Sequence, residues 1–200
     1  MKKIVLLILI AGLVWYFWPP LKSDIKNVKN RHWKIVVYGD SISYGKGAAR
    51  AESYPALLER SLGRPVINMG KNGETAANAA WRIQEVLDEK PYMVLIEFGG
   101  NDLMRSVSRN QTIAAVEQMV DAVQKAGAVA VIVDTGGSGL MRPYSKAYKK
   151  IAKEKGAIFV PGVLDGIFGK RNLMSDEIHP NAAGYKIIAG KVEKAIKPYL

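Results

Sequence analysis

Short apolar runs alternate with amphipathic stretches from residue 35 to the end of the chain. The runs are rich in β-branched residues, as strands are, and lie at Ile35–Tyr38, Val66–Asn68, Met93–Phe98, Val129–Asp134 and Ile158–Val160. Several are apolar at nearly every position, which favours a sheet that is covered on both faces. The alternation predicts a three-layer α/β domain with a doubly wound sheet of about five parallel strands.

The stretches between the runs carry helix signals. Ser53 precedes a Tyr-Pro pair and is a candidate N-cap with proline in the first turn. A helix is expected to begin near Thr75 and to continue through Leu87, because apolar residues recur there at helical spacing. Three further helices are expected: one that stops at Gly127, one over about 144–155 and one over about 185–196.

The amino terminus has a different pattern. Lys2 and Lys3 precede an uninterrupted apolar run, Ile4–Trp18, which ends in four aromatic residues of the kind that favour a bilayer interface. The length also suits a cleavable signal peptide, but no A-x-A-like site follows the run. We therefore expect an uncleaved membrane anchor over residues 1–21, a basic polar linker over 22–34 and one domain over 35–200.

Charge supports this division. The formal net charge is +11, and residues 1–34 hold +6 of it, where it favours anionic lipid headgroups. No basic stripe is interleaved with stacking aromatic residues, so nucleic-acid binding is not favoured. Both flanks of the apolar run are basic, and the positive-inside rule therefore leaves the orientation open.

Missing residue types narrow the chemistry. The chain has no cysteine, which excludes disulfides, thiolate metal sites and a cysteine nucleophile. Its two histidines, His32 and His179, are too few for a multi-histidine zinc site. No metal and no cofactor is expected.

Polar and glycine-rich segments follow the predicted strands, at the edge where parallel sheets bind ligands. They include Gly39-Asp40-Ser41 after the first strand, Gly99-Gly100-Asn101-Asp102 after the third, and Asp176 and His179 before the last helix. Each has a simpler explanation. Ser41 could cap a helix, Asn101 could form an Asx-turn, and Asp40, Asp102 and Asp134 could bond backbone amides; Ser43 and Ser138 are most simply turn residues.

Taken together, these residues indicate acyl transfer. A serine hydroxyl needs a base to accept its proton, and His179 is the single histidine after residue 34. Asp176 lies three positions earlier, close enough to orient that histidine. The backbone amides of Ser41 and Gly73 and the side-chain amide of Asn101 could stabilise a negative oxygen.

In these ordered blocks the chain resembles the SGNH (GDSL) hydrolases, and within them the bacterial thioesterase I, lysophospholipase L1 and arylesterase group. The resemblance covers residues from about 33 to 200 and implies a flavodoxin-like fold. It implies Ser41 as nucleophile, His179 as base and Asp176 as the residue that orients His179. It also implies an oxyanion hole formed by Ser41, Gly73 and Asn101, with Gly70 as the rival to Gly73. Ile42 departs from the leucine that often follows the serine.

The sequence does not match three other motifs, two of nucleotide-binding proteins and one of α/β-hydrolases. The segment from Gly39 to Lys46 has the wrong spacing for a P-loop and lacks its Ser/Thr. No G-x-G-x-x-G follows a strand, and Ser41 lacks the second glycine of a G-x-S-x-G elbow.

We therefore expect a serine esterase that hydrolyses carboxylic ester or thioester bonds. Its partners are expected to be the membrane and a small-molecule ester or lipid-like substrate; the oligomeric state is left open. Five residues near the predicted rim are candidates for an acyl pocket: Leu103, Met104, Leu140, Met141 and Tyr144.

Two alternatives stay open. An O-acetylesterase or acyltransferase acting on envelope glycans would use the same triad, and a membrane-tethered binding protein would have kept the fold without catalysis. The expected location is the bacterial cell envelope, anchored in the inner membrane with the domain in the periplasm or outside the cell. A cleaved, secreted form is the alternative.

Overall fold

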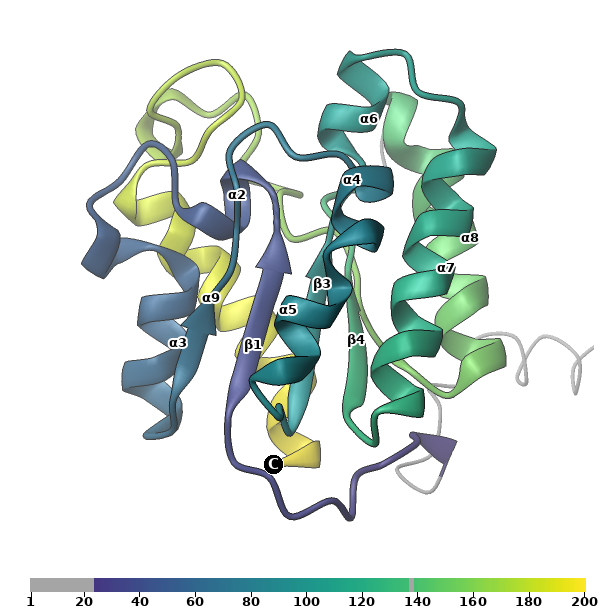
Figure 1. The fold of residues 1–200 in the computed structure, drawn as a ribbon. Helices are drawn as coiled ribbons and strands as arrows, with labels where there is room; N and C mark the ends of the chain where they lie inside the picture. The colour runs from purple at the N-terminus through teal and green to yellow at the C-terminus, as the bar shows by residue number, and fades with distance from the viewer. Residues whose placement is uncertain (1–23, 137–138) are drawn as a thin grey trace, which may run out of the picture.

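The computed structural model describes residues 24–136 and 139–200. Its single sheet has five parallel strands in the order β2-β1-β3-β4-β5, which is the flavodoxin-like order. The strands are β1 (Ile35–Gly39), β2 (Val66–Asn68), β3 (Met93–Glu97), β4 (Val129–Val133) and β5 (Ile158–Val160). All five lie where the apolar runs predict them, and the predicted doubly wound α/β architecture is confirmed (Figure 1).

Helices cover both faces of the sheet because alternate strand residues point to opposite sides. Ile35 and Val37 face a core formed with α3 (Tyr54–Leu62) and α9 (Ala182–Ile196). Val36 and Tyr38 face a second core, formed with four helices: α4 (Ala76–Trp81), α5 (Ile83–Asp88), α7 (Arg109–Lys125) and α8 (Arg142–Lys155). Figure 1 shows the resulting three layers.

Two short helices lie at the carboxyl edge of the sheet, the upper end in Figure 1: α2 (Ser41–Tyr44) after β1 and α6 (Gly100–Met104) after β3. The remaining elements are single turns of 3₁₀ helix: η2 (Arg50–Glu52), η3 (Gly139–Met141), η4 (Arg171–Leu173) and η5 (Lys197–Tyr199). The three later helices end as expected, and Gly156 closes α8 in the left-handed conformation.

The single helix expected from Thr75 through Leu87 is wrong, because it is interrupted at Arg82. Arg82 has φ −104° and ψ 17°, and its N–H donates to the Ala79 carbonyl, three residues back, at 3.0 Å. Its side chain turns back to Glu74. Hydrophobic spacing continues across such a break, so it leaves no trace in the periodicity. Ser53 does occupy the N-cap position of α3, but its hydroxyl donates to the Arg50 carbonyl instead of capping the helix.

Residues 24–34, within the predicted linker, pack against the domain at the amino ends of the strands. Ile25 is buried in the core with α3 and α9. The Asn27 side-chain amide donates to the carbonyls of Gln124 and Ala128, and the Asn30 amide lies within 3.2 Å of three carbonyls, including that of Tyr92.

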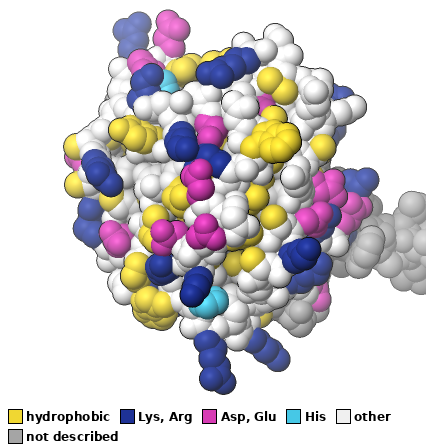
Figure 2. All heavy atoms as spheres, viewed as in Figure 1, with side chains coloured by type: hydrophobic (Ala, Val, Ile, Leu, Met, Phe, Trp, Pro, Cys, Tyr) yellow, Lys and Arg dark blue, Asp and Glu magenta, His cyan; other side chains and the backbone are white. Residues whose placement is uncertain are grey.

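The predicted anchor, residues 1–21, lies outside the described residues. Within 24–136 and 139–200, no helix is long and apolar enough to cross a bilayer. On the face shown in Figure 2, basic and acidic side chains are interspersed with small apolar areas.

Candidate active site

Ser41, His179 and Asp176 meet at the carboxyl edge of the sheet. Ser41 is the first residue of α2, while Asp176 and His179 lie in the loop between η4 and α9. His179 Nε2 lies 3.1 Å from Ser41 Oγ, and His179 Nδ1 lies 2.8 Å from Asp176 Oδ2. The tertiary structure thus joins a hydroxyl, an imidazole and a carboxylate in one hydrogen-bonded line.

Asp176 is held as an anion. Its carboxylate accepts from the His179 ring and from the backbone N–H groups of Ile178 and His179, at 2.8 to 2.9 Å. These hydrogen bonds, the one to the His179 ring first, lower the pKa of Asp176 to about 2. An ionised Asp176 accepts a hydrogen bond from the His179 Nδ1–H, and in that tautomer the Nε2 lone pair faces the Ser41 hydroxyl.

A tight turn brings the Ser41 helix against the histidine loop. Gly47 has φ +99°, and a Cβ there would lie 2.5 Å from the Pro180 carbonyl, so a glycine is required at this crossing. The Tyr185 hydroxyl, from α9, donates to the Lys46 carbonyl at 2.7 Å. These contacts hold Ser41 and His179 together although they lie 138 positions apart in the chain.

Asn101 lies beside this line and is buried. Its Nδ2 donates to Asp40 Oδ2 at 3.0 Å and to the Glu74 carbonyl at 3.1 Å. The loop that contains Gly73 therefore abuts the helix that carries Asn101. The predicted oxyanion donors Asn101 and Gly73 come from neighbouring segments.

The two candidate glycines of this loop differ. The Gly70 N–H donates to Asn68 Oδ1 at 2.9 Å. The Gly73 N–H has no hydrogen-bond acceptor among the described residues.

Two buried carboxyl groups contact the helix that begins at Ser41. Asp40 caps α2 by accepting from the Ile42 N–H at 2.9 Å. Glu97, at the end of β3, is fully buried, accepts from the Ser43 hydroxyl at 2.9 Å, and has one oxygen without a hydrogen-bond partner within the described ranges. Burial raises the pKa of Asp40 to about 6, and burial followed by the nearby Asp40 charge raises that of Glu97 well above its ordinary value.

Ser43 is therefore not a simple turn residue. It is fully buried in α2, where its hydroxyl bonds both Glu97 and the Tyr54 hydroxyl. Glu97 is the residue of this network that sequence reasoning missed. The available signal was a lone carboxylate in an otherwise apolar strand. Ser138, the other predicted turn residue, lies outside the described residues.

The other aspartates bond backbone amides, as their simpler explanation predicts. Asp102 accepts from the Ala76 N–H and Asp134 from the Gly162 N–H. Within the described ranges, no group of three or more His, Cys, Asp or Glu side chains is placed to hold a metal ion.

The five predicted pocket residues are not alike in the structure. Met104 and Leu140 are exposed, at 59% and 76%. Leu103 and Met141 are partly buried against the core, and Tyr144 is buried in it, edge-on to Tyr148. Asp176 itself lines a hollow, together with Gly169, Arg171, Met174, Ser175 and Glu177.

Two bacterial enzymes are similar in sequence to this chain along most of its length. The Esterase TesA of Pseudomonas aeruginosa is 29% identical over 178 residues, which cover 83% of this chain and 89% of that protein. The Thioesterase 1/protease 1/lysophospholipase L1 of Escherichia coli K12 is 28% identical over 173 residues, which cover 82% of this chain and 83% of that protein. A crystal structure of TesA superposes with a TM-score of 0.78 at 29% identity, covering 84% of this chain and 99% of that one.

The match to a family of enzymes is equally extensive. It runs from residue 37 to residue 187, from within β1 to within α9, and includes Ser41, Gly73, Asn101, Asp176 and His179. This range contains the whole sheet apart from the first residues of β1. The chain belongs to the GDSL-like Lipase/Acylhydrolase family, and it is a hydrolase of the SGNH type that acts on ester bonds.

Proposed function

We propose that this protein hydrolyses carboxylic esters or thioesters through an acyl-enzyme on Ser41. The observation that carries the proposal is the line from Asp176 through His179 to Ser41, with separations of 2.8 and 3.1 Å. Such spacing is within reach for proton transfer in a serine hydrolase.

Acylation begins when Ser41 Oγ attacks the substrate carbonyl carbon and its proton passes to His179 Nε2. The imidazolium that forms is stabilised by the Asp176 carboxylate, which remains ionised because its pKa is about 2. Collapse of the tetrahedral intermediate breaks the bond to the alcohol or thiol. His179 returns the proton to that leaving group.

The negative oxygen of the intermediate would be bound by the Ser41 and Gly73 N–H groups and by the Asn101 amide. Asn101 Nδ2 already donates to two acceptors, so one of its N–H groups must turn from the Glu74 carbonyl or Asp40 toward the substrate. A developing oxyanion is a stronger acceptor than a peptide carbonyl, which favours that exchange.

Deacylation repeats the sequence with water. His179 removes a proton from water, the hydroxide attacks the acyl carbon, and the bond to Ser41 Oγ breaks as His179 returns the proton to it. The substrate class follows from the names of the relatives, an esterase and a thioesterase/lysophospholipase. Exposed Met104 and Leu140 would contact a small or medium acyl chain.

Hydrolysis of aryl esters of increasing acyl length tests this assignment. Ser41→Ala should lower kcat by several orders of magnitude, because no nucleophile is left to form the acyl-enzyme. A fluorophosphonate probe should label the unaltered chain but not this variant. Ser61→Ala is the matched control, because among the described residues the Ser61 hydroxyl bonds only the Leu58 carbonyl. Equal turnover in Ser41→Ala and the unaltered chain would refute the proposal.

The proposed location is the bacterial cell envelope, with residues 1–21 as an inner-membrane anchor and the domain outside the cytoplasm. The support is the apolar run Ile4–Trp18 with its basic and aromatic flanks. On this proposal residues 35–200 form the catalytic domain, and residues 24–34 are packed against it.

A further inference from the structure

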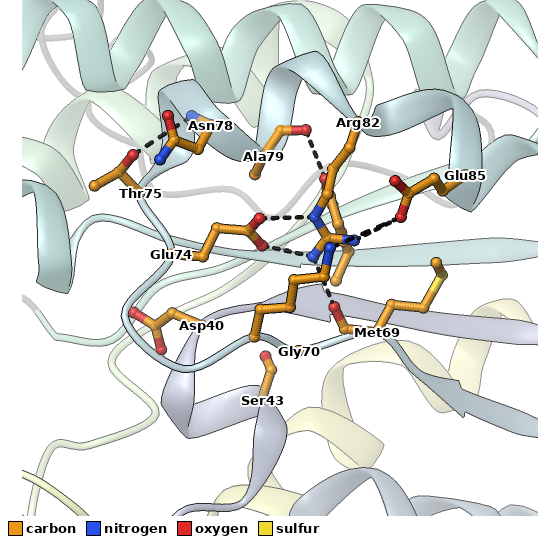
Figure 3. Close-up of polar contacts among 12 residues, drawn as sticks. Asp40, Ser43, Met69, Gly70, Glu74, Thr75, Asn78, Ala79, Arg82 and Glu85 are labelled. Carbon is orange, nitrogen blue, oxygen red and sulfur yellow. Dashed lines mark hydrogen bonds and ion pairs between the residues drawn. The ribbon is translucent and has the colours of Figure 1, made fainter.

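The side chain of Arg82 forms hydrogen bonds to the loop between β2 and α4. The guanidinium donates to both carboxylate oxygens of Glu74, at 2.7 Å from Nε and 2.5 Å from Nη2. The same Nη2 donates to the Met69 carbonyl at 3.0 Å. Met69 is the first residue of the loop and Glu74 the last but one, so Arg82 bridges the two ends of the loop (Figure 3).

These hydrogen bonds of Arg82 are largely shielded from water. The side chains of Arg82 and Glu74 are 11% and 9% exposed, and the guanidinium lies over the ring of Tyr38, 4.6 Å from its centroid. Burial works against the charge, but the hydrogen bonds with Glu74 hold the pKa of Arg82 above its ordinary value. A bidentate pair of this kind is geometrically specific, because the planar fork fits a carboxylate in one orientation.

Glu74 also contacts one candidate oxyanion donor, Asn101, and adjoins another, Gly73, in the chain. The Glu74 carbonyl accepts a hydrogen bond from Asn101 Nδ2 at 3.1 Å, and Glu74 directly follows Gly73 in the chain. Two residues further on, the Ala76 N–H donates to Asp102, the neighbour of Asn101. The loop from Gly73 to Ala76 is therefore fastened to α6 on one side and to Arg82 on the other.

We propose that Arg82 and Glu74 are positioning residues for the oxyanion hole, a role that rests on the proposed function of Ser41, Gly73 and Asn101. Arg82 fixes the Glu74 side chain, and the Glu74 backbone sets the place of the Gly73 N–H and of the Asn101 amide. Neither side chain contacts the substrate.

The placement of Arg82 supports this role over one in stability alone. A buried ion pair is seldom more stabilising than apolar residues of the same volume, because both charges must be desolvated. Here the pair also coincides with the interruption between α4 and α5. What the pair supplies is a fixed orientation of the loop beside Ser41.

Kinetics of Arg82→Lys and Glu74→Gln on a short-chain aryl ester test the proposal. Lysine keeps the charge but lacks the planar fork that pairs with both Glu74 oxygens in one fixed orientation. Glutamine keeps the shape of Glu74 and loses its charge. Removing one oxyanion donor outright costs about 10²–10³-fold in kcat, so displacing the donors should cost about 10–100-fold, with KM nearly unchanged. Lys155→Met breaks exposed ion pairs with Glu117 and Asp121, far from the site in sequence and sheet, and should leave kcat unchanged.

A second readout separates positioning from stability. A trifluoromethyl ketone that adds to Ser41 forms an oxyanion, whereas a non-hydrolysable ether analogue does not. In both variants the affinity for the ketone should fall by the same factor as kcat/KM, while the affinity for the ether stays constant. Assays well below each variant's Tm keep the protein folded, and if Arg82→Lys does not fold, Glu74→Gln decides.

The inference is overturned if both variants keep the kcat and ketone affinity of the unaltered chain, even with a lower Tm. It is also overturned if affinities for the ketone and the ether fall together. Failure of the proposed function looks different, since Ser41→Ala would then be active. An inactive Ser41→Ala beside fully active Arg82 and Glu74 variants would reject this inference alone.

Discussion

Three carboxyl groups near the candidate nucleophile are given different charges by their surroundings. Asp176 is half exposed and accepts several N–H donors, which hold its pKa at about 2. Asp40 and Glu97 are buried close together, and desolvation raises the pKa of each. The Asp176 carboxylate can therefore stabilise the His179 cation, whereas burial favours the neutral forms of Asp40 and Glu97.

This pair predicts how stability depends on pH. In the unfolded chain Asp40 and Glu97 ionise at their ordinary values of 3.8 and 4.5, whereas in the folded protein they retain protons to higher pH. The folded state then binds more protons, so the stability from this pair is full below about pH 4 and is lost as pH rises through 6 and beyond.

Glu97→Gln isolates the effect. Glutamine has a similar size, remains neutral and can bond Ser43, so it should become more stable relative to the unaltered chain as pH increases from about 4 to about 8. Urea unfolding at several pH values measures this difference. A difference that is constant with pH, or that has the opposite sign, would contradict a protonated Glu97.

At the scale of elements, the loop after β2 is fitted closely to the helix that carries Ser41. Gly70 has an ordinary φ, but a Cβ there would lie 2.4 Å from the Tyr44 nitrogen and 2.8 Å from the Ser43 carbonyl carbon. Both are backbone atoms of α2 and cannot rotate away. Gly70 therefore serves packing, since its N–H is already bonded to Asn68.

Gly70→Ala is expected to destabilise the fold by about 1–3 kcal/mol, in the range of other overpacking substitutions. It should also lower kcat, because α2 must shift and Ser41 moves with it. Gly190→Ala, in the middle of α9, is the matched control: a Cβ there meets nothing within 4 Å, and alanine should stabilise the helix by about 0.5–1 kcal/mol. Thermal unfolding and kcat measured on both variants test this, and a Gly70→Ala protein with unaltered Tm would refute the packing role.

At the scale of the whole molecule, the described chain begins at the end of the sheet opposite to the candidate site. Residues 24–34 lie at the amino ends of the strands, where Asn27 and Asn30 bond carbonyls of the domain, and Ser41 lies at the carboxyl ends (Figure 1). Few residues separate Asp24 from the proposed anchor. An anchor at this point would attach the domain to the membrane at the amino ends of the strands. The candidate site, at the carboxyl ends, would remain accessible to substrate.

A chain that begins at residue 24 should therefore leave the membrane fraction and keep its kcat and Tm, because the contacts of Ile25, Asn27 and Asn30 remain. The full chain should stay with membranes at high salt, since apolar contacts are not screened. Deleting residues 2–34 is the control and should lower Tm by exposing the carbonyls that Asn27 and Asn30 bond. Full-length protein in the soluble fraction would refute the anchor, and protection from external protease in spheroplasts would refute the periplasmic placement.

Local patterns in the sequence were enough to predict the five strands, most helix ends and the residues that meet at Ser41. Each strand is a short apolar run and each later helix ends at glycine or proline, signals that arise from neighbours along the chain. Polar segments after the first and third strands indicated Ser41 and Asn101, because parallel strands bring their carboxyl ends to one edge. Asp176 and His179 were indicated by their spacing before the last helix and by the resemblance to the SGNH hydrolases.

Other features depended on contacts between distant segments. The interruption at Arg82, the burial of Ser43 and Glu97 and the docking of residues 24–34 follow from hydrogen bonds and desolvation that form only after the layers pack. Hydrophobic periodicity records which residues are buried, but not which polar groups are buried with them. The sequence by itself therefore determined the fold and the candidate reacting groups, and the tertiary structure decided how those groups are held, because the cost of burying a charge depends on neighbours that are remote in the chain.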